Sequence, residues 1–330
     1  MAAAVILAGD VGGTKTYLAM CAGTGGFRPL YEGRYETSRF SSLGALLRAF
    51  AEEAGRRPDC VVVGVPGPVR QLPIRPVNLP WSIHPDEVRA ALGDPAVHLL
   101  NDLEATAYGT QVLAPEDRVS LNEAPVDPEG NVAVIAAGTG LGEGGLCWTG
   151  SGYTAIASEG GHASFAPTDA VAVELWSYLH ERYGHLSWER ILSGSGLASI
   201  YEFLRDTGRG TEPDWLAAEL AIAPDRAGAI SRAALAGRCE LASQALDLFV
   251  RLYGEEAGNL ALKFMATGGV YVGGGIAPKI LPRLQGGLFM RGFLNKGRMS
   301  EALRAVPVQV VRNDKTALMG AAYRGAQLLR

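Results

Sequence analysis

The stretch that decides the fold reads Gly9-Asp10-Val11-Gly12-Gly13-Thr14-Lys15-Thr16, and it directly follows the short apolar run Val5–Ala8. It nearly matches a P-loop, except that Thr14 stands where the second glycine belongs. A P-loop must also lead into a helix whose N-terminus faces the phosphates. The residues from 16 to 20 are instead β-branched, aromatic or apolar, as in a strand. We therefore predict a β-hairpin that grips a ligand at its tip.

A second glycine-rich loop, Gly138-Thr139-Gly140-Leu141-Gly142, follows the apolar run Val132–Ala137. With Gly145 it formally matches a dinucleotide-binding pattern, but that pattern also requires a helix next, and residues 145–157 look extended. Two strand–glycine–strand turns suggest two related halves that present backbone N–H groups to the same polyphosphate, because glycine permits close approach. For either loop alone, glycines that serve only as tight turns are the alternative.

Three further apolar runs end in turn or acidic residues: Cys60–Val65, Val97–Leu100 and Val270–Val272. Short runs of this kind predict strands buried on both faces of a sheet. Ligands bind at the carboxyl ends of such strands in open α/β sheets, so these ends are candidate functional positions. Helical periodicity is found over Leu43–Ala54, Pro85–Leu92, Ala170–Tyr183, Leu197–Arg205, Ala227–Met265 with an interruption, and Ala317–Leu328.

The composition bounds the class of protein. The chain has 330 residues, 48% of them hydrophobic and 19% charged, which fits two folded domains. A net charge of −4 argues against a nucleic-acid partner. No apolar run reaches the roughly 18 residues of a membrane span, and Met1–Leu7 lacks the basic residues of a signal peptide, so we expect a strand there and a cytoplasmic protein. The four cysteines form no C-x-x-C pair, and we expect four buried free thiols.

Several motifs carry a family resemblance. Gly9–Thr14 and Gly138–Gly142 resemble the two phosphate motifs of the actin/hexokinase/Hsp70 superfamily, and Tyr271–Pro278 resembles its adenosine motif. The resemblance is narrower, to bacterial glucokinases, at Leu100–Ala107, Glu159–His162 and Glu189–Gly194. These motifs follow one another along the whole chain in the order of that family, which makes the resemblance more specific than any single motif.

The resemblance implies an α/β fold with two ribonuclease-H-like (actin-like ATPase) domains flanking a cleft. The small domain would comprise residues 1–110, completed by the C-terminal helix 315–330. The large domain would comprise residues 111–314, with a helical insertion at about 170–265. A homodimer is compatible with the resemblance, and the sequence leaves the oligomeric state open.

The implied activity is that of a glucokinase: Mg²⁺-assisted transfer of the γ-phosphoryl group of ATP to the 6-hydroxyl of glucose, giving glucose 6-phosphate for glycolysis. Asp10 would hold Mg²⁺ through water, since Mg²⁺ retains several waters beside phosphates. The nucleotide-binding residues implied by the resemblance are Gly9, Asp10, Val11, Gly12, Gly13, Thr14, Gly138, Thr139, Gly140, Gly274 and Gly275.

In the same resemblance Asp102 would be the catalytic base and Asn101 would bind a neighbouring sugar hydroxyl. Glu159, His162 and Glu189 would bind further hydroxyls, because a neutral sugar needs several converging hydrogen-bonding groups. The residues alone leave other interpretations open. Asp102 could be a helix N-cap, and Glu189 could be a first-turn carboxylate facing a helix dipole. Glu159 and His162 lie in a glycine-rich segment and not on one helical face, which argues against a metal site there.

Two alternatives to a glucokinase remain at this point. One is a kinase for another hexose or an N-acyl hexosamine. The other is a sugar-sensing regulator, which would need a DNA-binding domain before Gly9 and a cysteine cluster after His162, and the sequence has neither. The sequence does not settle the exact sugar, the donor (ATP, polyphosphate or ADP) or the role of Lys15, which stands where the family usually has asparagine.

Overall fold

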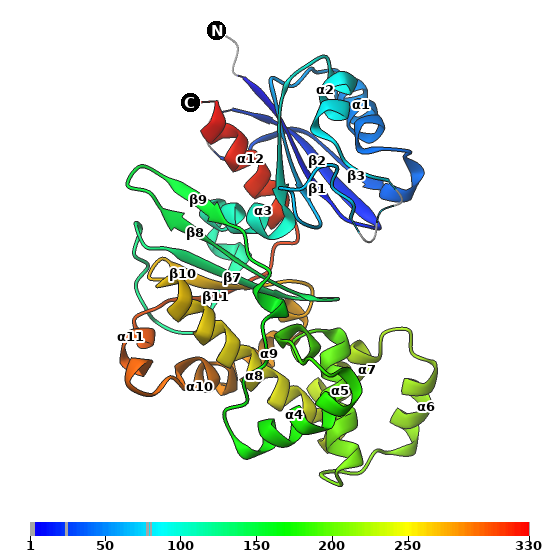
Figure 1. The fold of residues 1–330 in the computed structure, drawn as a ribbon, viewed down its shortest axis with the longest axis vertical. Coiled ribbons are helices and arrows are strands. Elements are labelled where there is room, and N and C mark those ends of the chain that lie inside the picture. The colour runs from blue at the N-terminus through cyan, green and yellow to red at the C-terminus, as the bar shows by residue number, and fades with distance from the viewer. Residues whose placement is uncertain (1–3, 24–25, 77–78, 80, 330) are drawn as a thin grey trace. The chain divides into compact units, whose positions relative to one another are not determined.

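The computed structural model describes residues 4–23, 26–76, 79 and 81–329, and it divides into two compact units (Figure 1). The first unit comprises Met1–Asp117, Ser151–Ala157 and Asn313–Arg330, and the second Arg118–Gly150 and Ser158–Arg312. The expected small domain of 1–110 and 315–330 therefore omits 111–117, 151–157 and 313–314. Residues 1–3 of the expected N-terminal strand lie outside the described part of the chain.

The first unit is built on a sheet with the strand order β3-β2-β1-β4-β5. These strands are β1 (Val5–Val11), β2 (Lys15–Ala22), β3 (Pro29–Glu36), β4 (Cys60–Val65) and β5 (Ala96–Asn101). β1 and β2 are antiparallel, whereas β1, β4 and β5 run parallel to one another. All of β4 is buried, as expected. In β5 only Val97 is buried, so the prediction of a strand buried on both faces is wrong there, because β5 lies at the sheet edge.

Helices α1 (Leu43–Ala54) and α2 (Pro85–Leu92) have the predicted bounds and pack against each other. Their apolar residues share a core with β1, β2 and β4. The α1 residues that are buried follow a helical spacing of three and four, which places one apolar stripe on the sheet: Leu43, Leu46, Leu47 and Phe50. α1 ends at Gly55, whose φ of 61° is a left-handed conformation that glycine adopts without strain.

Helices α3 (Asp102–Gly109) and α12 (Thr316–Leu328) pack against each other in the first unit, although they are far apart in the sequence (Figure 1). α12 shares a core with β1 and β4, which contains Leu318 and Ala321. α3 and α12 cross with their backbones in contact. A Cβ atom at Gly320 would lie 1.8 Å from the Ala105 carbonyl oxygen, and one at Gly109 would lie 2.0 Å from the Thr316 oxygen. Larger residues at these two glycines would push the helices apart.

A short strand from the middle of the sequence, β9 (Tyr153–Ile156), also belongs to the first unit. β9 contacts α3, and the Tyr108 hydroxyl of α3 accepts a hydrogen bond of 3.0 Å from the Ala155 N–H. Residues 151–157 are grouped with the first unit, in which they make this contact, and β9 is also the edge strand of the six-stranded sheet.

The second sheet has the strand order β6-β11-β10-β7-β8-β9, and all of its strands except β9 belong to the second unit. They are β6 (Arg118–Ser120), β7 (Val132–Ala137), β8 (Leu141–Trp148), β10 (Gly269–Gly273) and β11 (Val308–Val311). β7 and β8 form an antiparallel hairpin whose last pair is Ala137 opposite Leu141. β10 runs parallel to both β7 and β11. The carboxyl ends of β7 and β10 therefore lie side by side, where their glycine turns begin.

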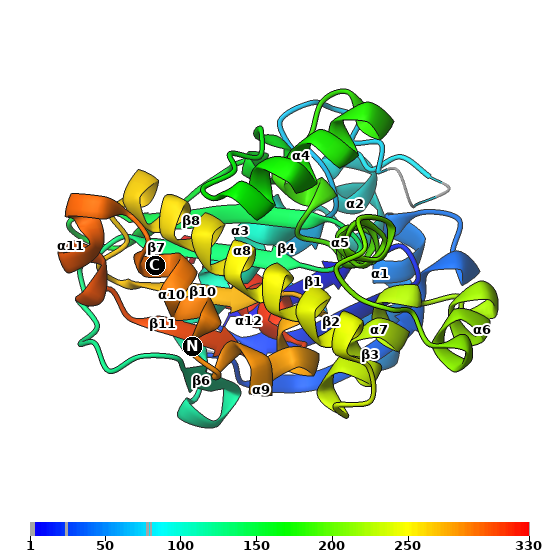
Figure 2. The ribbon, with the colours of Figure 1, turned by 90° about the horizontal axis from the view of Figure 1, so that it is seen from below.

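The helices of the second unit fall into two groups. The predicted insertion contains α4 (Ala170–Tyr183), α5 (Gly194–Asp206), α6 (Asp214–Ile222), α7 (Arg226–Leu235) and α8 (Glu240–Phe264). The expected interruption of the segment 227–265 lies between α7 and α8, and α8 then crosses the sheet against β7, β8 and β10 (Figure 2). After β10 come the short helices α9 (Leu281–Leu284), α10 (Leu288–Leu294) and α11 (Ser300–Arg304), and α10 packs on α8.

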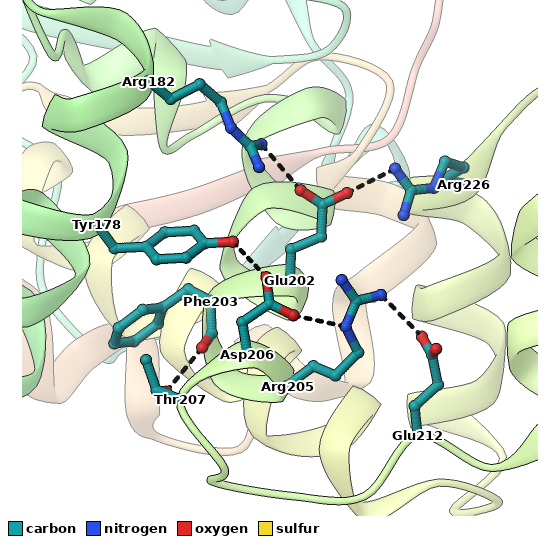
Figure 3. A network of polar contacts seen from close by, with 9 residues as sticks. All are labelled: Tyr178, Arg182, Glu202, Phe203, Arg205, Asp206, Thr207, Glu212 and Arg226. Carbon is teal, nitrogen blue, oxygen red and sulfur yellow. Dashed lines mark hydrogen bonds and ion pairs between the residues drawn. The ribbon is translucent and has the colours of Figure 1, made fainter.

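A network of ion pairs and hydrogen bonds joins the helices of the insertion (Figure 3). Glu202 of α5 accepts from Arg182 of α4 at 2.9 Å and from Arg226 of α7 at 2.7 Å. Burial raises the pKa of Glu202, but the hydrogen bonds from the two arginines outweigh it and hold that pKa below its usual value. One turn further along α5, Asp206 accepts a hydrogen bond of 2.7 Å from the Tyr178 hydroxyl of α4. The network fixes α4 and α7 to α5.

The structure bears on two expectations from the sequence, one about membrane spans and one about the cysteines. Among the helices that the structure describes, none is long and apolar enough to cross a membrane. The four cysteines are free, but only Cys21, Cys60 and Cys239 are buried. The expectation of four buried thiols is wrong for Cys147, which is half-buried near the end of β8, where that strand leaves the core.

Candidate functional site

The first glycine turn joins β1 to β2, so the predicted hairpin is confirmed and the stretch is not a P-loop. Gly12 N–H donates to the Lys15 carbonyl at 2.9 Å, which closes the turn. The Thr37 hydroxyl donates to Gly12 O at 2.8 Å and lies 2.9 Å from the Thr16 hydroxyl, and both threonine side chains are fully buried. Thr37 therefore holds the turn from its buried side, whereas Thr14 and Lys15 at the tip of the turn are exposed.

Three carboxylates of the first unit influence one another near the end of β1. Burial, together with the negative charges of Asp102 and Asp314, raises the pKa of Asp10 to about 7. Such a position favours a proton or a cation. Carboxylate oxygens are ligands that Mg²⁺ prefers, so the donor set fits this ion. Within the described part of the chain no group of three or more His, Cys, Asp or Glu side chains is placed to hold a metal directly.

The start of α3 separates the roles of Asn101 and Asp102. Asn101 is the N-cap: its Oδ1 accepts from Leu103 N–H at 2.9 Å, and Glu104 accepts from Asn101 N–H at 2.9 Å, which completes a capping box. The interpretation of Asp102 as the N-cap is therefore wrong. Asp102 is the first residue of the helix, and its Oδ1 also accepts from Leu103 N–H at 2.9 Å. The Asn101 amide donates to Gly67 O at 3.2 Å.

The second glycine turn joins β7 to β8 in the second unit, as predicted. Gly138 N–H donates to Gly140 O at 2.8 Å, and Gly194 N–H donates to Gly138 O at 2.9 Å. Leu141 N–H donates to Glu189 Oε2 at 3.1 Å. A Cβ atom at Gly140 would lie 2.4 Å from that same oxygen, so only glycine allows Glu189 this close to the turn.

Glu159, His162 and Glu189 converge in the second unit. His162 Nε2 lies 4.0 Å from Glu159 Oε2, and its Nδ1 lies 4.0 Å from Glu189 Oε1. Glu159 immediately precedes a single 3₁₀ turn over Gly160–His162, so the two residues do not lie together on the face of one helix. The side chains of Glu159 and His162 are 68% and 62% exposed, and that of Glu189 is 31% exposed. Three polar groups that converge and remain open to solvent can bind the hydroxyls of a sugar.

Glu189 has a partner that the sequence did not suggest. It lies in the 3₁₀ turn Trp188–Arg190, whose preceding residue Ser187 makes no capping bond. One Glu189 oxygen binds the backbone of the second glycine turn and the other faces His162. Glu189 therefore connects the predicted sugar-binding residues to a predicted phosphate turn, and this is a more specific role than a carboxylate facing a helix dipole.

The turn after β10 rests on the end of β7. Gly274 has a φ of 81°, and a Cβ atom there would lie 2.3 Å from Ala137 O, so a side chain would be strained and would clash. Ile276 N–H donates to that same carbonyl at 3.2 Å. Gly274 and Gly275 are exposed, and a Cβ atom at Gly275 would have no neighbour within 4 Å. The backbone is thus accessible to a ligand.

Tyr253, which sequence reasoning missed, lies beneath both turns of the second unit. Its hydroxyl accepts from Ala137 N–H at 3.1 Å and lies 3.3 Å from the carbonyl oxygens of Ile135 and Gly273, either of which can accept its proton. Burial raises the pKa of this tyrosine, so the hydroxyl stays neutral. The hydroxyl ties the end of β7 to the end of β10. A tyrosine within the long helix α8 matches no motif, so the sequence carried no signal for it.

The sequence is similar to proteins of one family over almost its whole length. The sequence profile of the family described as Glucokinase matches residues 7–328. The glucokinase of Synechocystis sp. is 42% identical, over 97% of this chain and 98% of that protein. The glucokinase of Chromobacterium violaceum is 35% identical, over 96% of this chain and 88% of that protein.

Solved structures agree. A glucokinase from an Antarctic psychrotroph superposes with a TM-score of 0.87 at 30% identity, over 98% of this chain and 99% of that one. A ROK family glucokinase from Streptomyces griseus, in complex with glucose and AMPPNP, has a TM-score of 0.64 at 22% identity over 98% of this chain and 99% of that one, which concerns the fold alone. The two units have the actin-like ATPase fold that the sequence predicted. The chain belongs to the glucokinase family.

Proposed function

We propose that this chain transfers the γ-phosphoryl group of ATP to the 6-hydroxyl of glucose. The observation that carries the proposal is the hydrogen bond from Leu141 N–H to Glu189, because it joins a phosphate turn to a convergent set of hydroxyl-binding side chains. Membership of the glucokinase family supports the same reaction. The proposal places the reaction in the cytoplasm, where glucose 6-phosphate would enter glycolysis.

Asp102 is the base in this proposal. Its carboxylate accepts the proton of the 6-hydroxyl while that oxygen forms a bond to the γ-phosphorus, and the bond from the γ-phosphorus to the oxygen it shares with the β-phosphate breaks, releasing ADP. Phosphoryl transfer needs little more from a protein than positioning, neutralisation of charge and such a base. The rigid capping box at Asn101 supports the proposal, because it holds the first turn of α3, and with it Asp102, in place.

The glycine turns bind the nucleotide. Backbone N–H groups of residues 9–14 and 138–140 would face the phosphates, since compact turns of this kind form anion-binding concavities. Gly274 and Gly275 leave room for the adenosine part to approach the backbone. Asp10 would hold Mg²⁺ through water, and this ion supplies neutralisation of the phosphate charge. The raised pKa of Asp10 supports the assignment, because a nearby cation would relieve the repulsion among the three carboxylates.

In this proposal the converging side chains of the second unit bind the sugar. Glu159, His162 and Glu189 accept from or donate to adjacent hydroxyls. Asn101 has a smaller part than its motif suggests, because its Oδ1 caps α3 and one amide hydrogen is used by Gly67. Its second amide hydrogen can still reach a sugar oxygen.

The test is Asp102→Asn, assayed for sugar phosphate formation with a panel of hexoses, N-acyl hexosamines and phosphoryl donors. We expect kcat to fall by about 10²–10⁴-fold, the usual contribution of a general base, with glucose still bound. Asp86→Asn is a matched control, since Asp86 is an exposed aspartate in the first turn of α2. A kcat like that of the wild type in Asp102→Asn contradicts the role of Asp102, and another hexose or a hexosamine as the preferred substrate contradicts the choice of glucose.

A further inference from the structure

A buried carboxyl that the proposed reaction does not use lies beneath the turn carrying Glu159 and His162. Glu143 of β8 is 1% exposed, and neither of its carboxyl oxygens has a donor within hydrogen-bond distance. A Cβ atom at Gly160 would lie only 2.2 Å from Glu143 Oε2. The carboxyl therefore touches the backbone of the turn at Gly160, and this close approach requires a glycine there.

Glu143 faces a second buried carboxyl, Glu256 of α8, which is 0% exposed. Glu256 accepts a hydrogen bond of 2.7 Å from the Asn259 amide and lies 3.4 Å from Lys263 Nζ. These partners stabilise a negative charge on Glu256. Two adjacent buried carboxylates cannot both be ionised at low cost, so the pair holds one proton. The proton belongs on Glu143, from where it can be donated to Glu256.

The electrostatics agree with this assignment. Burial and the charge of Glu256 raise the pKa of Glu143, the charge of Lys263 opposes them, and the result is a pKa of about 8. The other groups of this region do not change the order. The Tyr253 hydroxyl stays neutral, and the nearby Lys296 has a pKa that burial lowers and the α8 carboxylates raise.

Glu255 is the remaining carboxylate of this part of α8, and it is engaged elsewhere. It pairs with Arg251 one turn earlier on the helix and accepts a hydrogen bond of 2.9 Å from the Thr168 hydroxyl. Its charge is thus matched by the arginine. Glu143 remains as the one group of this cluster that the structure places against the backbone of Gly160.

We propose that Glu143 is a positioning residue of the sugar site: its neutral carboxyl, shared with Glu256, supports the turn over residues 158–162 and sets the positions of Glu159 and His162. The inference rests on the proposed function. When Glu143 loses its proton, its charge repels Glu256 and adds a second negative charge beneath the turn. The turn then moves, and glucose is bound less tightly.

The sign of the pH dependence follows. Glucose binds the form in which Glu143 is protonated, so affinity is full at pH 6.5–7 and falls as the pH rises through about 8. For a single proton, the dissociation constant for glucose increases about tenfold between pH 7 and pH 9. The kcat at saturating glucose should change much less, because glucose in excess restores the protonated form.

The experiment is a titration of glucose binding by calorimetry from pH 6.5 to 9.5, with steady-state kinetics over the same range. Glu143→Gln keeps the shape of the neutral acid and can donate to Glu256, so its dissociation constant should lose the alkaline rise. Glu240→Gln, at the exposed start of α8, is the matched control and should keep the rise of the wild type. An alkaline rise in Glu143→Gln equal to that of the wild type overturns the inference.

A second variant covers the case in which Glu143→Gln does not fold. Glu256→Gln removes the charge that helps to keep the proton on Glu143, so the alkaline rise should move to lower pH, and an unmoved rise overturns the inference. The proposed function fails in a different way: wild-type protein at pH 7 would neither bind nor phosphorylate glucose. Binding in the wild type with a profile that neither variant alters leaves the function intact and refutes only the role of Glu143.

Discussion

Replacing Tyr253 with phenylalanine removes one oxygen atom from beneath two ligand-binding turns. The ring keeps its packing against Phe249 and Phe289, so no cavity forms. Ala137 N–H, however, loses its acceptor in a fully buried place. Leaving one buried donor unsatisfied costs about 1–3 kcal/mol. Because each kcal/mol lowers Tm by about 2–4 °C in a unit of this size, we expect Tm to fall by about 2–12 °C.

The same change should affect ATP more than glucose. Ala137 and Gly273 end the strands that lead into the second phosphate turn and the Gly274 turn. If displacement of these turns weakens ATP binding by about 1 kcal/mol, the KM for ATP rises about fivefold. Urea unfolding and steady-state kinetics measure the two effects.

Tyr178→Phe is the matched control, because its hydroxyl donates to Asp206 in an exposed position within the network of the helical insertion (Figure 3). We expect it to lose less than about 1 kcal/mol and to keep the wild-type KM for ATP. Unchanged stability in Tyr253→Phe would refute the hydrogen-bond argument. Lower stability with an unchanged KM for ATP would show that the hydroxyl stabilises the fold without positioning the turns.

Three further substitutions have definite expected outcomes. Glu189→Ala should raise the KM for glucose by about tenfold or more and reduce the preference of the enzyme for glucose over its epimers. The KM for ATP should rise less, because the hydrogen bond to the second glycine turn is also lost. An unaltered glucose KM and epimer preference would refute the sugar contact. Asp10→Asn should weaken Mg²⁺-dependent activity but stabilise the fold. The pKa of Asp10 is about 7 in the folded protein against 3.8 when unfolded, so ionisation of Asp10 destabilises the native state by up to about 4 kcal/mol as the pH rises. The gain in unfolding free energy measured in urea should therefore grow from pH 4 to pH 8, and a gain that does not depend on pH would contradict this argument. Glu202→Gln should cost about 1–3 kcal/mol, since Arg182 and Arg226 lose their carboxylate, while both KM values stay as in the wild type; a changed KM would mean that the helical insertion affects the site.

The local features of the two phosphate turns could be predicted from the sequence because they depend on short stretches. β-branched and aromatic residues after Gly9–Thr14 exclude the helix that a P-loop needs, and β2 is indeed a strand. The order of strands in a sheet depends instead on segments that are distant in the sequence. The apolar run Val97–Leu100 resembles a central strand, but β5 has a neighbour on one side only, which no local pattern reveals.

The alternative interpretation of Asp102 as an N-cap placed the cap at the right junction but on the wrong residue. Asn101 and Asp102 can both cap a helix, and the choice depends on backbone angles that the sequence does not contain: Asn101 is extended, with φ −65° and ψ 152°.

The supporting residues of the site were not predictable. Glu143 in a strand, Tyr253 in a helix and Thr37 after β3 acquire their roles only when distant segments pack together. The residues that a motif marks are those that would touch the ligand, and the residues that hold them in place belong to no motif.

The position of α12 has a consequence for how the protein is made. The core beneath β1 and β4 contains Leu318 and Ala321, so α12 must leave the ribosome before the first unit can bury that face of its sheet. Domains synthesised first generally also fold first. Here the second unit, apart from the last strand β11, has been synthesised almost completely while the first still exposes the apolar side chains of Ile6, Ala8 and Val62. During synthesis β1 and β4 therefore wait for α12, and they are the strands on which we expect a chaperone to act.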